Sequence, residues 1–554
     1  MNNNSLKIIN IGGTSVQKNM FVYEYLDEIV VFDCGIGFPE IDDFGVDIII
    51  PDFDYLLKNR DKIKGLIITH AHEDHYSAVP YLLKEIPLKI YTHKMVQDFL
   101  KNKLKDHNNL QDLNFVSIDS ENEFKVGNYF IINPYRVNHS VPNTMGFFVT
   151  TPTVTVVHQS DFKFDFTPIM DRPADIHRMV SLSARLKPLL LLSDSLGINA
   201  EGFTKSEKFI EETFDSLVSK AQGQVFITTI SSNISRIQQA INTGVKHGRK
   251  VVIRGYSMEN NLEVAIKYGM MKNTKGSLLR EEEVRNYKPK NLLYIIPGNY
   301  GQVGSSLDKI ADNKNKNIKI KPDDLVIFSG DPIPGTEGLV DKLIEKLIKR
   351  GAKVVYGEIQ NDLHVSGHGS YGDLSLMAHL IMPKYLAPIG GGLKQIKSYK
   401  EALSSQGFNK SNIVEFMDGE SILVHENFVE KGETIETKQV YVSKDSSSSI
   451  LTPFVINDRK QISENGVLFV VVPYKNGQLL FNSPNIYTRG FIYLKENMSI
   501  INGMVQNVSV VLKSLPQNTD FQTVRRAVEK SLTKHLIKRV GEIPLIVVEK
   551  IEIV

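Results

Sequence analysis

The chain has 554 residues, of which 42% are hydrophobic and 23% charged, and it carries a formal net charge of +2. This length predicts about three or four domains, and the near-neutral charge excludes a uniformly basic polyanion-binding protein, so any nucleic-acid surface must come from local clustering. No apolar run approaches the ~20 residues of a membrane span and Met1–Ser5 is polar, so we expect a cytoplasmic protein with no membrane partner and no signal peptide.

The first part of the chain reads as strands. Apolar runs alternate with turns over residues 6–55, which predicts a β-meander that feeds one sheet of a sandwich. The single cysteine, Cys34, lies in V-V-F-D-C-G and is expected to be a buried strand residue because it has no partner for a disulfide. A further buried strand is predicted at Leu66–Ile68, followed by a helix over Tyr76–Lys84.

A polar cluster separates that strand from that helix. The sequence T-H-A-H-E-D-H places His70, His72, Asp74 and His75 at positions i, i+2, i+4 and i+5 of a tight turn. Imidazole and carboxylate groups at this spacing can direct several lone pairs into one small volume, which suits zinc or manganese. The alternative is a polar loop that is merely rich in histidine. Glu73 lies inside the motif, but no role is assigned to it.

Two more candidate ligands follow later strands. His139 comes directly after F-I-I-N-P-Y-R-V-N, and Asp161 follows T-V-T-V-V-H-Q-S. Ligands at the ends of separate strands can converge on one edge of a sandwich, which is what a binuclear hydrolase site requires. The run K-P-L-L-L-L-S-D-S closes this part of the chain, with Asp194 and Ser195 at its tip.

The pattern changes after about residue 207. Continuous apolar strands alternate with helices, such as those predicted at Ile234–His247 and Asn260–Tyr268, up to residue 364, which favours a doubly wound α/β insert. The run K-D-S-S-S-S is typical of a linker. The tail beyond it, residues 451–554, contains 13 Lys/Arg and 8 Asp/Glu and so carries +5. Such a tail can hold RNA or a partner subunit, or its charges can belong to a solvated helix face.

The motif T-H-A-H-E-D-H resembles the HxHxDH motif of the metallo-β-lactamase fold, and nearly the whole chain resembles the ribonuclease J family of bacterial RNA-degrading enzymes. The resemblance implies an α/β fold class, with a metallo-β-lactamase αββα sandwich, an inserted β-CASP α/β domain and a small C-terminal α+β domain. The expected boundaries are 1–206 and 365–443 for the two parts of the lactamase domain, 207–364 for the β-CASP insert, 444–450 for the linker and 451–554 for the C-terminal domain.

The same resemblance implies roles for individual residues. One metal ion would be held by His70, His72 and His139, and the second by Asp74 and His75, with Asp161 bridging the two. Asp33 would brace the metal loop. Asp74 and His368 are the expected catalytic residues, and the residues expected to contact substrate are Ser232, Asn233, His364, Val365, Ser366, Gly367 and His368. For Ser232 and Asn233 an ordinary helix N-cap is an equal alternative.

The chain also departs from the family pattern. Gly390, in P-I-G-G-G, stands where the family has a metal-binding histidine, so the second metal site is expected to be weak. Four other departures are expected around the same cavity: Asn143, Ser235, Gln302 and Gly392. Together they indicate relaxed constraint on catalysis.

The resemblance therefore implies a metal-dependent ribonuclease that hydrolyses RNA from a 5′-monophosphorylated end in the 5′ to 3′ direction, with endonuclease activity in addition, in rRNA maturation and mRNA decay. Two divalent metal ions are expected, with zinc first and manganese or magnesium as alternatives. The expected assembly is a homodimer, a homotetramer or a hetero-oligomer with a paralogue. One rival hypothesis is a weakly active or inactive paralogue that assembles with an active subunit. Another is a metallo-β-lactamase hydrolase that acts on small molecules, which the insert and the C-terminal domain disfavour.

Overall fold

The structure is a computed structural model that describes residues 4–14, 17–39, 45–105, 113–330, 336–443, 449–481, 484–491 and 498–553. These residues form two compact units: Met1–Ile41 with Ile48–Gln439, and Asp42–Asp47 with Val440–Val554. Residues 444–448 of the predicted linker, and most of the strand predicted in G-F-I-Y-L, lie outside the described residues.

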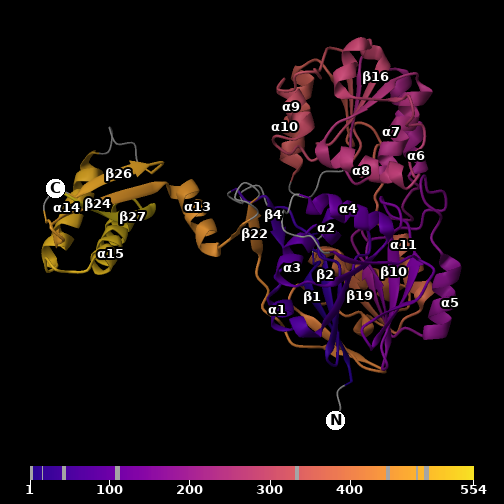
Figure 1. Ribbon diagram of the computed structural model, residues 1–554, viewed down its shortest axis with the longest axis horizontal. Helices are drawn as coiled ribbons and strands as arrows, with labels where there is room; N and C mark the ends of the chain where they lie inside the picture. The colour runs from indigo at the N-terminus through magenta and orange to yellow at the C-terminus, as the bar shows by residue number, and fades with distance from the viewer. Residues whose placement is uncertain are drawn as a thin grey trace. The chain divides into compact units, whose positions relative to one another are not determined.

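The first unit contains a sandwich of two sheets (Figure 1). The eight-stranded sheet has the order β21 (Val429–Lys431), β20 (Ser421–Val424), β1 (Leu6–Gly12), β2 (Met20–Tyr25), β3 (Glu28–Phe32), β5 (Ile63–Ile67), β6 (Lys89–Thr92) and β7 (Asn114–Ser117). The six-stranded sheet has the order β19 (Tyr385–Ile389), β12 (Leu190–Asp194), β11 (Thr155–Gln159), β10 (Met145–Thr150), β9 (Phe130–Arg136) and β8 (Phe124–Val126). Two segments far apart in the sequence, before and after the α/β insert, therefore complete the same sheets.

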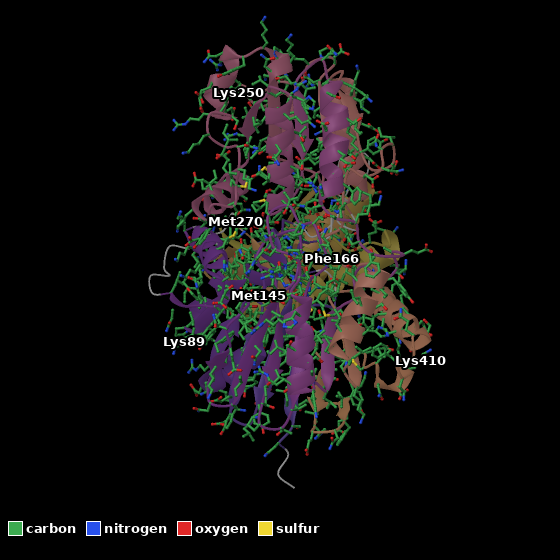
Figure 2. All side chains as sticks on the ribbon, turned by 90° about the vertical axis from the view of Figure 1, so that its right-hand side faces the viewer. Lys89, Met145, Phe166, Lys250, Met270 and Lys410 are labelled. Atoms are coloured by element: carbon green, nitrogen blue, oxygen red, sulfur yellow. The ribbon has the colours of Figure 1, made fainter. Side chains whose placement is uncertain are left out.

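Apolar side chains from both sheets form one core between them. Phe32 of the first sheet and Phe147 of the second are fully buried there, with ring centroids 5.7 Å apart. Met145 of β10 belongs to the same core and lies near the middle of the view in Figure 2, while Lys89 and Lys410 lie near the edges of the molecule. The outer face of the second sheet is covered by α5 (Ile176–Leu186), α11 (Tyr371–Ile381) and α12 (Leu393–Ser405). The other elements of this part are β4 (Ile48–Ile50), α1 (Asp54–Lys58), η1 (Arg60–Lys62), α4 (Lys94–Leu104) and η4 (Lys410–Asn412).

The helix predicted over Tyr76–Lys84 is in fact two short helices, α2 (Glu73–Tyr76) and α3 (Val79–Glu85). Pro80 lies in the first turn of α3, where its missing N–H costs nothing, but it cannot donate within a continuous helix. The break has a functional consequence. Because α2 begins at Glu73, Asp74 and His75 project from a helix and not from a loop.

The predicted α/β insert forms a six-stranded parallel sheet of its own. Its order is β15 (Leu278–Leu279), β14 (Lys250–Ile253), β16 (Leu292–Ile296), β13 (Val225–Thr228), β17 (Leu325–Phe328) and β18 (Lys353–Val355). The helical segments of the insert are α6 (Lys208–Ser219), α7 (Ile234–Lys246), α8 (Tyr256–Lys267), η2 (Glu281–Asn286), η3 (Pro289–Asn291), α9 (Ser306–Ala311) and α10 (Glu337–Lys349). Figure 1 shows helices on both faces of this sheet, as a doubly wound arrangement requires.

The second unit has a sheet covered by two long helices. Strand β24 (Val467–Lys475) pairs with β25 (Gln478–Leu479) and β26 (Asn485–Arg489), and it runs parallel to β27 (Leu545–Glu552). The two helices are α14 (Met498–Ser514) and α15 (Phe521–Arg539). The remaining elements are β22 (Val440–Ser443), β23 (Ser449–Leu451) and α13 (Pro453–Asn465).

Helix α13 was not predicted. It contains no buried residue, so its sequence lacks the apolar periodicity that identifies a packed helix. Thr452 as N-cap and Pro453 in the first turn were the available signals. Within the described residues, no helix combines the length and the apolar character that crossing a membrane requires.

Candidate metal centre

The motif residues meet at one edge of the sandwich. His70 and His72 follow β5, His139 follows β9, and Asp161 follows β11. The structure thus brings together ligands from both sheets, and all the side chains concerned are buried or nearly so.

The first group consists of His70, His72, His139 and Asp161, whose candidate ligand atoms all lie within 4.8 Å of one another. Nδ1 of His72 lies 3.2 Å from Nε2 of His70 and 2.9 Å from Nε2 of His139. Oδ2 of Asp161 lies 3.7 Å from Nε2 of His70 and 3.6 Å from Nε2 of His139. Three ring nitrogens and one carboxylate oxygen therefore face a common point.

Hydrogen bonds on the far side of two rings fix which nitrogen carries the proton. Nδ1 of His139 donates to the carbonyl of Gly367 at 2.7 Å, and Nδ1 of His70 lies 2.9 Å from the hydroxyl of Thr69. That hydroxyl itself donates to Asp33 at 2.8 Å, so it accepts from His70. Both Nε2 atoms therefore present lone pairs. Lone pairs this close repel one another unless a cation lies between them, and the donor set fits a divalent metal.

Burial keeps these rings neutral. It holds the pKa values of His70 and His139 well below the ordinary value, and it lowers the pKa of His72 to about 3. Neutral imidazole is the form that binds metal. Asp161 shows the opposite balance, since burial opposes its charge but His75 and His368 hold its pKa well below the usual range.

The second group consists of Asp74, His75 and Asp161. Nε2 of His75 lies 3.4 Å from Oδ2 of Asp74 and 3.3 Å from Oδ2 of Asp161, and its Nδ1 lies 2.8 Å from Asp33. Burial opposes protonation of His75, yet the three carboxylates outweigh burial and raise its pKa well above the ordinary value. The surroundings therefore stabilise positive charge beside Nε2, where a second cation would lie.

Asp33 braces this region. Its carboxylate accepts from the backbone N–H and the hydroxyl of Thr69, each at 2.8 Å, as well as facing His75. Asp33 belongs to none of the described clusters that could hold a metal ion. It orients His75 and, through Thr69, His70.

His368 approaches the centre from the loop after the α/β insert. Its Nδ1 lies 2.8 Å from Oδ2 of Asp194, and its Nε2 lies 3.7 Å from Oδ2 of Asp161. Burial opposes its charge, but Asp194 and Asp161 outweigh burial and raise its pKa to about 9. Asp194, noted in the sequence only as a strand-end residue, thus orients His368.

The other predicted substrate residues lie on two loops. Gly367 approaches His139 so closely that a Cβ there would lie 2.6 Å from the imidazole, so this position requires glycine. Ser366 caps the loop by accepting from the N–H of His368 at 3.0 Å, while Val365 is buried and His364 is half-buried. Asn233 is the N-cap of α7 and accepts from Arg236 N at 2.9 Å, which is the alternative weighed for it. Ser232 precedes it on the same turn.

Gly390 lies beside Asp194. Its φ is +72°, as expected for this glycine turn, and a Cβ there would lie 3.3 Å from Oδ1 of Asp194. A side chain at position 390 would therefore begin next to Asp194, the hydrogen-bond partner of His368. Asn143 is another departure from the family pattern. Its backbone N–H donates to Asp171 at 2.9 Å, and its side-chain amide contacts the sulfur of Met95.

Asn19 was missed by sequence reasoning. Its side chain is 4% exposed, and its amide nitrogen lies 3.1 Å from Nε2 of His75 and 3.4 Å from Oδ2 of Asp74. An amide donor at this position satisfies the ligand atoms of the second group. The only signal in the sequence was an asparagine directly before a strand.

A buried ion network joins the metal-site loops to the α/β insert, and it too was missed. Glu207, 2% exposed, accepts from Arg236 Nη2 at 2.8 Å and faces Lys163 Nζ at 3.3 Å. Lys163 follows Asp161 by two residues and donates to the carbonyl of Ser366 at 3.1 Å. Arg236 donates to the carbonyl of Leu363 at 3.1 Å. The two cations thus hold both ends of the loop that carries His368.

Comparisons with known proteins agree with this geometry. The family model of the metallo-beta-lactamase superfamily matches residues 13–194, that of the ribonuclease J beta-CASP domain matches residues 222–347, and that of the ribonuclease J C-terminal domain matches residues 454–553. These matches confirm the predicted family and the predicted fold class.

Similar proteins cover nearly the whole chain. Ribonuclease J 1 of Streptococcus pyogenes serotype M3 is 33% identical over 548 residues, which is 98% of this chain and 97% of that protein. Ribonuclease J of Helicobacter pylori is 36% identical over 92% of this chain and 74% of its own length. Ribonuclease J2 of Bacillus subtilis is 29% identical over 99% of this chain and 98% of its own. A crystal structure of an Enterococcus faecalis protein of unknown function shares the fold, with a TM-score of 0.53 and 15% identity over 76% of this chain and all of its own.

The ion network predicts a stability effect that depends on pH. Burial alone would raise the pKa of Glu207, but Arg236 and Lys163 lower it from 4.5 to about 2. Because the folded-state pKa lies below the unfolded one, the contribution is complete above pH 4.5 and is lost as the pH falls toward 2. We expect Glu207→Gln to lower the free energy of unfolding at pH 7 by about 3 kcal/mol, since it leaves two buried cations without their partner.

Urea unfolding of both proteins between pH 7 and acid pH tests this expectation, and the difference should narrow below pH 4.5. The matched control is Glu212→Gln, at an exposed position of helix α6, which begins directly after Glu207. An equal difference at every pH would contradict the assignment.

Proposed function

The chain belongs to the ribonuclease J family, and on that basis we propose that it hydrolyses RNA phosphodiester bonds with divalent metal ions held by its two His–Asp groups. The observation that carries the proposal is the convergence of three unprotonated ring nitrogens and Asp161 within 4.8 Å. His70, His72 and His139 would hold one ion, and Asp74 and His75 would hold the other. Asp161 would contribute to both sites. Zinc is the expected metal, with manganese or magnesium as alternatives.

Bound divalent ions supply a hydroxide nucleophile at neutral pH and neutralise charge on the phosphodiester. The chain's own residues would bind the phosphate and supply the proton for the leaving group. His368, charged at neutral pH because its pKa is about 9, presents Nε2 to the same cavity. It can donate a hydrogen bond to a phosphate oxygen and a proton to the departing 3′ oxygen. Asp194 holds the ring in the orientation that this role needs.

We propose an RNA with a 5′-monophosphate as substrate, degraded from 5′ to 3′ and also cut internally, in the cytoplasm. The loop His364–His368 supplies backbone N–H groups in a glycine-containing turn, an arrangement that can approach a phosphate closely. Ser232 and Asn233 start helix α7, whose N-terminal end favours a negative charge. A homo-oligomer, or an assembly with a paralogue, is the proposed form.

The second metal site is proposed to be the weaker one. It has two carboxylates and one imidazole, and at Gly390 the chain has no side chain to offer. Asn19 already directs an amide nitrogen at His75 and Asp74. Reduced occupancy of the site that Asp74, His75 and Asp161 would hold would therefore reduce catalysis.

His72→Ala tests the function directly. Removing this ring leaves the first group without the nitrogen that lies within 3.2 Å of both other imidazoles, so RNA cleavage should fall by at least about 100-fold and bound metal should be lost. Degradation of a 5′-monophosphorylated RNA and metal analysis of the purified protein give the two readouts. His177→Ala, at an exposed position on α5, should behave like the natural protein. Undiminished cleavage by the His72 variant would refute the proposed site.

Gly390→His tests the weakness of the second site. The new imidazole should raise metal occupancy toward two ions per chain and increase the rate of RNA cleavage. The matched control is Gly390→Ala, because it adds the same Cβ beside Asp194 and the same strain of about 1 kcal/mol at φ +72° but no ligand. If the histidine and alanine variants have the same occupancy and rate, Gly390 is not the cause of a weak site.

A further inference from the structure

Helix α15 of the second unit has two opposite faces of different chemistry. One face is apolar and fully buried in the core of this unit, through Val524, Val528, Leu532 and Leu536. The face pointing away from that core carries four exposed cations at four-residue intervals, here called the basic ridge: Arg526, Lys530, Lys534 and Lys538. At 1.5 Å per residue, the ridge is about 18 Å long.

The basic ridge is electrostatically unfavourable for an isolated helix. Its members form three consecutive like-charged i,i+4 pairs, and each such pair costs a helix a few tenths of a kcal/mol. The single acidic residue of α15, Glu529, pairs with Arg525 at 2.8 Å. Throughout the part of the chain that the structure describes, no ion pair or hydrogen bond involves a side chain of the ridge.

Exposed helices elsewhere in the protein are built differently. On α10, Lys346 pairs with Asp308 and Asp312 at 2.7 and 2.9 Å. On α12, Lys397 and Lys400 both reach Glu415, at 2.5 and 2.8 Å. A face that only needs solvation can mix signs in this way. The ridge keeps one sign along its whole length, which indicates a partner of the opposite sign.

We propose that the basic ridge binds the phosphate backbone of RNA outside the catalytic centre, so that the C-terminal unit holds part of a long substrate. The inference rests on the proposed function for the choice of RNA among polyanions. The charge distribution supports it, because residues 451–554 carry +5 while the remaining 450 residues sum to −3. A row of side chains at regular spacing can follow consecutive phosphates without reading sequence.

A membrane surface fits less well. Basic helices that lie in a bilayer interface insert an apolar face, but that face of α15 is packed against α14 and the sheet. Ser531 of α15 donates to Asn507 of α14 at 2.9 Å, and this contact holds the two helices together. An acidic protein partner is the remaining alternative, and the experiment below distinguishes it from RNA.

The test is the variant Arg526→Gln/Lys530→Gln/Lys534→Gln/Lys538→Gln in the full-length protein. The control is Lys460→Gln/Lys475→Gln/Lys513→Gln/Lys550→Gln. It removes an equal number of positive charges from other exposed positions of the same unit. Both sets are introduced into His72→Ala protein, so that RNA stays intact during binding measurements. We expect the ridge variant to bind a single-stranded RNA of about 40 nucleotides at least tenfold more weakly at low salt, and the slope of log K against log salt to fall by about 3.

Kinetics with the His72-containing proteins give an independent readout. The ridge variant should show a raised KM and an unchanged kcat on the long RNA, with both parameters unchanged on an oligonucleotide of about 6 nucleotides. Its unfolding temperature should not fall, because like-charge repulsion has been removed.

Equal RNA affinity of the ridge variant and the natural protein would overturn the proposal, as would an equal loss in the control variant. Unchanged RNA affinity together with an altered oligomer mass would assign the ridge to a protein contact instead. Because binding is measured without cleavage, a protein that binds RNA through the ridge but never cleaves it would contradict the proposed function and not this inference.

Discussion

The metal centre rests on one constraint: three uncharged imidazole rings are held together around the buried carboxylate of Asp161. Nδ1 of His72 lies within 3.2 Å of Nε2 of both His70 and His139 beside a buried carboxylate, and burial keeps the rings from taking up protons. A cation between the ligands would relieve the repulsion between their lone pairs. The outward-facing nitrogen of each ring has a hydrogen-bond partner: Thr69 for His70, Ser140 for His72 and the Gly367 carbonyl for His139.

The α/β insert is tied to this centre by charge as well as by chain connectivity. Glu207 bridges Lys163, two residues beyond Asp161, and Arg236, in the first helix after the insert's central strand β13. Both cations also bind carbonyls of the loop that leads to His368. Movement of the insert would therefore displace the same loop that contributes the Gly367 carbonyl and the His368 imidazole. This coupling gives a physical reason why the α/β insert can set the geometry of the metal centre.

The sequence predicted the parts of the site that have local patterns. His70, His72, Asp74 and His75 were recognisable by spacing within six residues, and His139 and Asp161 by their places after strands. Asn19, Glu207 and Arg236 could not be found in this way, because each is a single polar residue whose partners are distant in the chain. The break between α2 and α3 was signalled by Pro80 but outweighed by the apolar run, and α13 has no apolar face to reveal it. Periodicity predicts burial; it does not predict which buried charges meet.

The most direct test of the account is metal dependence of RNA cleavage in a single preparation. Chelator-treated protein is titrated with zinc or manganese while metal binding and degradation of a 5′-monophosphorylated RNA are followed together. We expect no cleavage without metal, tight binding of a first ion, and a rate that rises only as a second, more weakly held ion binds. Full activity in the chelated protein, or no cleavage at any metal concentration by protein that remains folded, would contradict it.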